Sequence, residues 1–188
     1  MTETPNPHIV DTDTLTGEMH PIRRGVLALG SNMGERFNNL QGAVSTLADT
    51  PEVVVTDVSP VYETTPVGGP EGARDYLNAV VAIDTTLSAH TMLERCLAVE
   101  DAFGRVRTER GAPRTLDVDL IVLGERLCDD DDLKLPHPRA HERAFVLKPW
   151  SDIEPEAEIP GQGRVVDLLG KLELDGVRLR KDAHLEHN

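Results

Sequence analysis

Two aspartates, Asp117 and Asp119, lie at the start of an apolar run that ends at Gly124. Residues two apart on a β-strand point to the same face, so both carboxylates would project together. Like charges at that spacing repel each other, and a shared cation relieves the repulsion. Mg²⁺ favours a site of one or two carboxylates completed by water and substrate phosphate. Two solvated acids at a strand end would give the same pattern, so the pair alone leaves both interpretations open.

A basic segment, RVRTERGAPR, comes directly before this pair. It carries four arginines: Arg105, Arg107, Arg110 and Arg114. Guanidinium groups bind phosphate oxygens in a bidentate manner, and arginine beside a metal can offset charge on a leaving group. Together with the aspartates, the segment predicts a polyphosphate site whose Gly- and Pro-containing loop could close over a nucleotide. A solvated basic loop without a role is the alternative.

Other polar and aromatic residues suggest further parts of a site. Tyr76 and Asn78 lie two apart on a predicted strand, and Phe145 follows a histidine- and arginine-rich segment. An aromatic ring and an amide suit a flat heterocycle, although ordinary core packing gives the same spacing. The turn GSNMG, residues 30–34, could cradle phosphate, but a tight turn that packs the loops above it is favoured because it matches no phosphate-binding motif.

A zinc site at His137 and His141, with Cys128 upstream, is disfavoured. Pro138 lies between the histidines, and no second cysteine is close in sequence. A histidine beside a polyphosphate is more useful as a hydrogen-bond donor to a phosphate oxygen, or as an acid.

The composition limits the class of protein. A chain of 188 residues with 39% apolar and 28% charged residues fits one globular domain with its own core. The net charge of −14 disfavours a general nucleic-acid binder. There is no apolar run long enough to span a membrane, and the polar N-terminal residues do not form a secretory signal. We therefore expect a cytoplasmic protein in which Cys96 and Cys128 are free thiols.

Hydrophobic periodicity predicts the elements that position these residues. Strands are expected over 25–31, 53–64, 76–87 and the run through Leu123, and helices over 36–49 and 88–103. Pro60 suggests that the distal part of the second strand lies at an edge or a bulge. The order βαββαβ predicts an α+β, ferredoxin-like core with a mainly antiparallel sheet and mobile loops around the site. A helical segment near 140–153 and a weakly amphipathic piece, VVDLLGKLEL, are expected to follow.

We divide the chain into a flexible N-terminal extension (residues 1–22), a catalytic domain (23–160) and a C-terminal extension (161–188) that packs on the domain or trails from it.

The segment RGAPRTLDVDLI, residues 110–121, resembles the signature of the 6-hydroxymethyl-7,8-dihydropterin pyrophosphokinase family of folate biosynthesis. LGSNMG, VYETTPVG, DYLNAVV and LPHPRAHERAFVL match the family in the same order. The resemblance runs from about Val26 to Pro160.

The resemblance implies Mg²⁺-dependent transfer of diphosphate from ATP to the pterin hydroxymethyl group, with release of AMP. It implies two Mg²⁺ ions held by Asp117 and Asp119, which act in catalysis with Arg105 and Arg114. The implied ATP-binding residues are Glu100, Arg107, Arg110, Leu120, His137 and Arg143. The implied pterin-binding residues are Thr64, Thr65, Val67, Tyr76, Asn78 and Phe145.

The sequence departs from the family at two positions. Gly111 stands where some members have a lid tryptophan, and Leu97 stands where some have a polar nucleotide contact. The expected partners are ATP and a dihydropterin, without nucleic acid or membrane, for a monomer that could associate with other folate-pathway enzymes. Two alternatives are a binding module for single-stranded RNA, disfavoured by the charge and the scarcity of aromatic residues, and a different Mg²⁺-dependent phosphoryl transferase.

Overall fold

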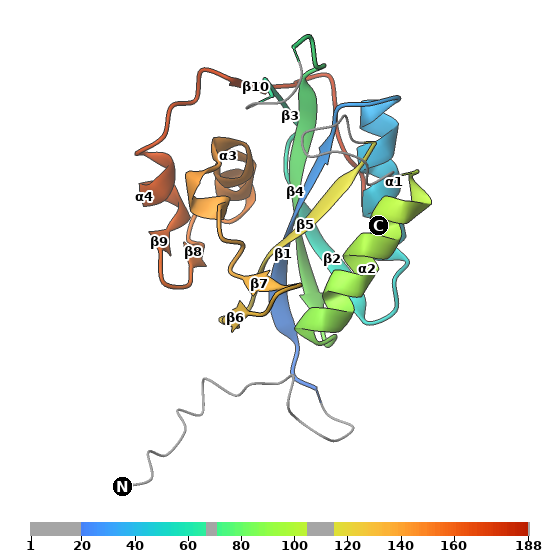
Figure 1. Ribbon diagram of the computed structural model, residues 1–188, viewed down its shortest axis with the longest axis vertical. Coiled ribbons are helices and arrows are strands. Elements are labelled where there is room, and N and C mark those ends of the chain that lie inside the picture. The colour runs from blue at the N-terminus through green and yellow to red at the C-terminus, as the bar shows by residue number, and fades with distance from the viewer. Residues whose placement is uncertain (1–19, 67–70, 105–114, 188) are drawn as a thin grey trace, which may run out of the picture.

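The computed structural model describes residues 20–66, 71–104 and 115–187 (Figure 1). The first part of the chain alternates strands and helices. These are β1 (Arg23–Ser31), α1 (Arg36–Ala48), β2 (Val53–Val58), β3 (Tyr62–Thr64), β4 (Tyr76–Thr85), α2 (Ala89–Ala102) and β5 (Asp117–Leu123). The second part has shorter elements. These are β6 (Cys128–Asp129), β7 (Lys134–Leu135), a 3₁₀ turn η2 (Ala140–Glu142), α3 (Ala144–Ile153), β8 (Glu158–Ile159), β9 (Gly163–Arg164), α4 (Val165–Leu169) and β10 (Val177–Leu179).

A six-stranded sheet forms the centre of the molecule. Its strands follow the order β10-β3-β4-β1-β5, and β2 pairs with β4 beside β3. Every pairing in this sheet is antiparallel. The helices α1 and α2 cover one face, and α3 and α4 lie on the other (Figure 1). The predicted α+β class with a mainly antiparallel sheet is therefore confirmed.

The two predicted long helices form because their apolar residues repeat at helical spacing. Helix α1 buries Leu40, Ala43, Val44 and Leu47 against the sheet. Ser88 begins α2 as its N-cap, since its hydroxyl accepts a hydrogen bond from the main-chain N–H of Thr91 at 3.2 Å. Both helices therefore agree with the sequence prediction to within two residues at each end.

The second predicted strand is broken in the structure. β2 ends at Val58 and β3 begins at Tyr62, while the Ser59 hydroxyl accepts the N–H of Val80 at 2.8 Å across the break. The distal part, β3, is not an edge strand because β10 pairs with its outer side. The register against β4 shifts by one residue within β2, between Val55 and Asp57, and by one more between Val58 and Tyr62. The edge alternative was wrong, because the strand that covers β3 comes more than 100 residues later. The bulge alternative agrees with the extra residue that the registers place around Pro60.

The C-terminal residues return to the sheet and to α1. β10 pairs with β3, and Ala183 is buried in the core cluster to which α1 and α2 also contribute. Gln41 on α1 exchanges two hydrogen bonds with the main chain of Glu186, at 2.8 and 2.9 Å. Only the start of the predicted amphipathic piece is helical, because α4 ends before Gly170. Within the described ranges, no helix has both the length and the apolar character needed to cross a bilayer.

Candidate active site

The two aspartates occupy alternate positions at the start of β5. Asp117 pairs with Gly30 and Asp119 with Ala28 on the neighbouring strand β1. Between and after them, Val118 and Leu120 are buried on the face covered by α1 and α2. The aspartates are half-buried and project from the opposite face, the one on which α3 and α4 lie. Alternation along β5 thus places both carboxylates together, as the sequence pattern requires.

Arg143 places a cation close to Asp119. Its Nη1 lies 4.0 Å from Asp119 Oδ2, and its guanidinium carbon lies 5.5 Å from the centre of the Phe145 ring. Burial lowers the pKa of Arg143 from its usual value, and Asp119 acts in the opposite direction, so the guanidinium keeps its charge. The Phe145 ring, in the first turn of α3, therefore stabilises a cation that faces the carboxylates.

His137 lies on the outer side of β5. Its main-chain N–H donates to the carbonyl of Ile121 at 2.8 Å. Burial, then Arg143 and Arg139, lower the pKa of its imidazole to about 4, so the ring is neutral near pH 7. Its Nδ1 accepts the N–H of Arg139 at 3.2 Å, which leaves the proton on Nε2. His137 is therefore placed as a neutral hydrogen-bond donor.

Glu100 supports the strand between the two aspartates. Its side chain is 1% exposed on α2, and its Oε1 accepts the N–H of Val118 at 2.9 Å. That N–H therefore points away from β1, and the N–H of Leu120, two residues on, has the same direction. Because the Leu120 side chain is buried, a ligand at this edge could meet only its main chain. Nucleotide contacts by Glu100 and Leu120 stay predictions.

The predicted heterocycle residues lie one strand away from the carboxylates. Gly30 on β1 pairs with Asp117 on one side and with Asn78 on the other, so the three share one face. Asn78 donates its Nδ2 to Thr64 Oγ1 at 2.5 Å. A Cβ on Gly30 would lie 3.0 Å from Asn78 Oδ1 and 3.6 Å from the Tyr76 ring. The missing side chain thus leaves room for both groups, about 10 Å from Asp117 at two strand spacings.

The segment before Tyr76 is fixed by charged residues that the sequence reasoning did not identify. Glu63 contacts Arg36 at 3.0 Å and Arg180 at 2.7 Å. Arg178 contacts Asp75 at 2.7 Å. Burial raises the pKa of Glu63, but hydrogen bonds and charge from Arg36 and Arg180 outweigh it and hold the pKa below its usual value. No local pattern reveals this network, because β10 joins it from more than 100 residues away.

Asn39 is a second residue that the sequence reasoning missed. Its Nδ2 lies within hydrogen-bond distance of Ser31 Oγ, Met33 O and Thr115 O, at 3.2, 3.0 and 3.1 Å. It therefore ties the turn after β1 to the residues that lead into β5. The turn has the tight geometry expected for GSNMG, with Gly34 at φ +67°, which favours glycine.

The remaining predicted residues are placed as follows. Thr65 donates its N–H to Gly176 O at 3.2 Å, beside β10. Phe145 lies in the first turn of α3 and packs against the core on that face. The predicted residues Val67, Arg105, Arg107, Arg110 and Arg114, with Gly111, lie outside the described residues.

Residues 26–155 match the sequence model of a family described as 7,8-dihydro-6-hydroxymethylpterin-pyrophosphokinase (HPPK). The chain belongs to this family. HPPK relatives include a protein of Methylorubrum extorquens, 44% identical over 157 residues, which cover 83% of this chain and 98% of the relative. A protein of Pseudomonas aeruginosa is 38% identical over 156 residues, covering 83% and 96%. Both are named 2-amino-4-hydroxy-6-hydroxymethyldihydropteridine pyrophosphokinase.

HPPK domains of solved structures have the same fold. The Plasmodium falciparum HPPK-DHPS structure with pterin and p-hydroxybenzoate superposes with a TM-score of 0.64 at 14% identity. The match covers 82% of this chain and 44% of that chain, so this chain spans less than half of the Plasmodium protein. Membership of the HPPK family identifies the chain as an enzyme, an ATP-dependent diphosphotransferase.

Proposed function

We propose that this enzyme transfers diphosphate from ATP to the hydroxymethyl group of 6-hydroxymethyl-7,8-dihydropterin, giving AMP and the pterin diphosphate in folate biosynthesis. One observation carries the proposal beyond family membership. Asn78, Gly30 and Asp117 are aligned across three adjacent strands, on one face. A group suited to a heterocycle edge thus lies about 10 Å from carboxylates suited to a metal–triphosphate, on the same face of the sheet.

In this proposal, the pterin ring lies between Tyr76 and Phe145. Asn78 forms hydrogen bonds with the edge of the ring. Its amide is oriented for this by the hydrogen bond from Nδ2 to Thr64 Oγ1, at 2.5 Å. Thr64, Thr65 and Val67 line the rest of the pocket. The charged network around Glu63 supports the main chain on either side, at β3 and just before Tyr76.

The carboxylates of Asp117 and Asp119 fit two Mg²⁺ ions. Both offer oxygen donors from one face of an edge strand, and Arg143 at 4.0 Å from Asp119 can bind phosphate oxygens beside them. Asp117 and Asp119 would hold the ions, whose positive charge would offset the negative charge of the triphosphate facing the nucleophile. Glu100 keeps the strand between the two aspartates in place through the N–H of Val118.

The nucleotide is expected to contact Glu100, Arg107, Arg110, Leu120, His137 and Arg143. His137 donates from Nε2 to a phosphate or ribose oxygen, since its imidazole is neutral. Arg105 and Arg114 reach the phosphates during the reaction.

The reaction is an in-line displacement at the β-phosphorus of ATP. The pterin hydroxyl oxygen forms the new bond to this phosphorus and its proton passes to solvent water, while the bond from the β-phosphorus to the bridging oxygen that leaves with AMP breaks. The chain contributes by fixing the two substrates in line and by placing Arg143 and the loop arginines against the developing charge.

We further propose that the core is ferredoxin-like and that residues 23–160 form the catalytic domain. The order β5-β1-β4-β2, connected as βαββαβ, supports this fold. Residues 161–188 would be an extension packed on it, as the contacts of β10 and Glu186 support. Association with another folate-pathway enzyme is suggested by the HPPK-DHPS chains that share the fold.

Product analysis tests the proposed reaction. The purified chain is incubated with ATP, Mg²⁺ and 6-hydroxymethyl-7,8-dihydropterin, and the nucleotides and pterins are separated and quantified. We expect AMP and pterin diphosphate in equal amounts, and no AMP with a 6-methyl pterin that lacks the hydroxyl. ADP as the product would indicate ordinary kinase chemistry, and no turnover would favour a binding module.

A further inference from the structure

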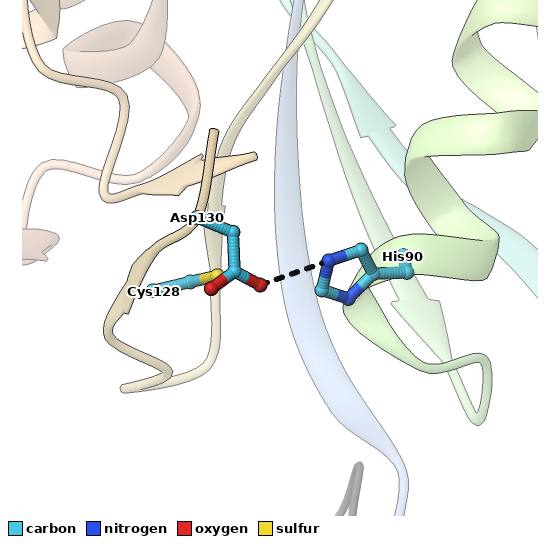
Figure 2. A group of neighbouring side chains, drawn as sticks. All are labelled: His90, Cys128 and Asp130. Carbon is cyan, nitrogen blue, oxygen red and sulfur yellow. Dashed lines mark ion pairs between the residues drawn. The ribbon is translucent and has the colours of Figure 1, made fainter. Parts of the chain in front are cut away.

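A group of potential metal ligands lies at the end of the sheet opposite Asp117. His90 is in the first turn of α2, Cys128 is on β6, and Asp130 follows β6 directly. Figure 2 shows the three side chains converging from these two parts of the chain. Within the described residues, they are the one set of at least three His, Cys, Asp or Glu side chains whose donor atoms converge closely enough for a metal ion.

The donor atoms are close enough to share one ion. His90 Nε2 lies 3.1 Å from Asp130 Oδ2, and all three donors lie within 4.8 Å of one another (Figure 2). In a tetrahedral zinc site, bonds of about 2.0–2.3 Å place neighbouring ligands about 3.3–3.6 Å apart. Only small side-chain rotations would therefore bring the three donors to bonding distance around a common ion.

The hairpin β6–β7 holds two of the donors in position. Cys128 pairs with Leu135, and Asp130 donates its N–H to Leu133 O at 3.0 Å. Lys134 binds the side chain of Asp129 at 2.6 Å and so engages that carboxylate on the hairpin itself. Residues 129–132 are four consecutive aspartates, and they are not equivalent, because Asp130 and Asp132 approach His90 on α2 whereas Asp129 contacts Lys134.

Asp132 can complete the set. Its Oδ1 lies 3.6 Å from His90 Nε2, and its side chain is 69% exposed, so it or a water molecule can provide a fourth ligand. A thiolate and a carboxylate would together neutralise a divalent ion, while imidazole stays neutral. Thiolate and imidazole favour Zn²⁺ over the hard ions Mg²⁺ and Ca²⁺.

We propose that His90, Cys128 and Asp130 form a Zn²⁺ site, separate from the catalytic centre, that links the β6–β7 hairpin to the start of α2. Binding forms bonds from the ion to His90 Nε2, Cys128 Sγ and an Asp130 carboxylate oxygen. The thiol loses its proton to solvent, so one proton is released and no redox step is needed.

Cobalt and zinc titrations of the full-length, reduced chain test this proposal. Co²⁺ bound to a thiolate gives a near-ultraviolet charge-transfer band, which reports Cys128 specifically if Cys128→Ser abolishes it. We expect this band in the wild type at one equivalent, its displacement by Zn²⁺ but not by excess Mg²⁺, and its loss in Cys128→Ser. His90→Ala should weaken Zn²⁺ binding at least tenfold.

Two controls separate this site from other metal binding. His184→Ala, a histidine of the C-terminal segment, should leave the Zn²⁺ affinity unchanged. Asp117→Asn should leave the cobalt band unchanged, so failure of the proposed catalytic function does not affect this result. The absence of a band in the wild type, a band that persists in Cys128→Ser, or unchanged Zn²⁺ affinity in His90→Ala would each overturn the proposal.

Discussion

Replacing Gly30 with alanine should weaken pterin binding while leaving the fold intact. The new Cβ would lie 3.0 Å from Asn78 Oδ1, whereas ordinary contacts begin near 3.4 Å. Asn78 must therefore move by a few tenths of an ångström. Its amide cannot move freely, because Nδ2 is held by Thr64 Oγ1 at 2.5 Å. The added methyl group thus turns the amide away from the orientation that the pterin edge needs.

The magnitude follows from the loss or weakening of one hydrogen bond. A neutral hydrogen bond is worth about 0.5–1.5 kcal/mol, and about 1.4 kcal/mol corresponds to a tenfold change in affinity. We therefore expect KM for the pterin to rise about two- to twelvefold in Gly30→Ala. KM for ATP should stay within about twofold of the wild type, since no Asp117 atom is among the near contacts of the new Cβ.

Gly25→Ala is the matched control on the same strand. Its Cβ would lie 2.9 Å from Ile83 Cγ1, in the apolar core and away from the site. Overpacking of this kind costs about 1–3 kcal/mol, which lowers Tm by about 2–10 °C in a domain of this size. Steady-state kinetics and thermal unfolding of both variants provide the comparison. A Gly30→Ala enzyme with an unchanged pterin KM would refute the placement of Asn78 at the pterin edge.

Three further predictions concern residues around the site. The pKa of His137 is about 4 in the folded chain and about 6.5 in the unfolded chain. The unfolded chain therefore takes up the proton first as the pH falls, so the stability contributed by the neutral ring is present above pH 6.5 and is lost as the pH falls to 4. Denaturant unfolding should show this loss, about 2 kcal/mol for a partly exposed ring, reduced in His137→Gln. Glu100→Ala should lower the free energy of unfolding by about 1–3 kcal/mol, because it leaves the Val118 N–H unpaired. Tm should be higher in Glu100→Gln than in Glu100→Ala, because the glutamine amide oxygen still accepts that N–H. Arg178→Ala should raise the pterin KM with kcat nearly unchanged, because it loosens Asp75 beside Tyr76; an effect on kcat alone would contradict this positioning role.

Much of the fold could be predicted from local patterns. The apolar spacing of α1, the serine cap of α2 and the β-branched residues of β2 and β4 each act within a short stretch of chain. β10 could not be predicted, because Val177–Leu179 is a short and largely exposed strand. Within the described residues it pairs with β3 alone, and its one arginine, Arg178, contacts both Glu63 and Asp75, so its signal is not local.

The site divides in the same way. The alternation of Asp117 and Asp119 follows from strand geometry alone. The alignment of Gly30 between Asn78 and Asp117 depends on the register of three strands, which one-dimensional periodicity does not specify. The sequence also did not predict that Cys128 lies near His90 on α2, because His90 is 38 residues away along the chain.

The rate of AMP formation in aspartate variants tests the central claim most directly. Asp117→Asn and Asp119→Asn are assayed over a range of Mg²⁺ concentrations with ATP and 6-hydroxymethyl-7,8-dihydropterin, and Asp129→Asn, on the β6–β7 hairpin, serves as the control. We predict that either site variant loses AMP formation by on the order of 100-fold or more, with Tm within about 3 °C of the wild type and the control unaffected. Near-normal AMP formation in Asp117→Asn or Asp119→Asn would contradict the assignment of these carboxylates to the catalytic metal site.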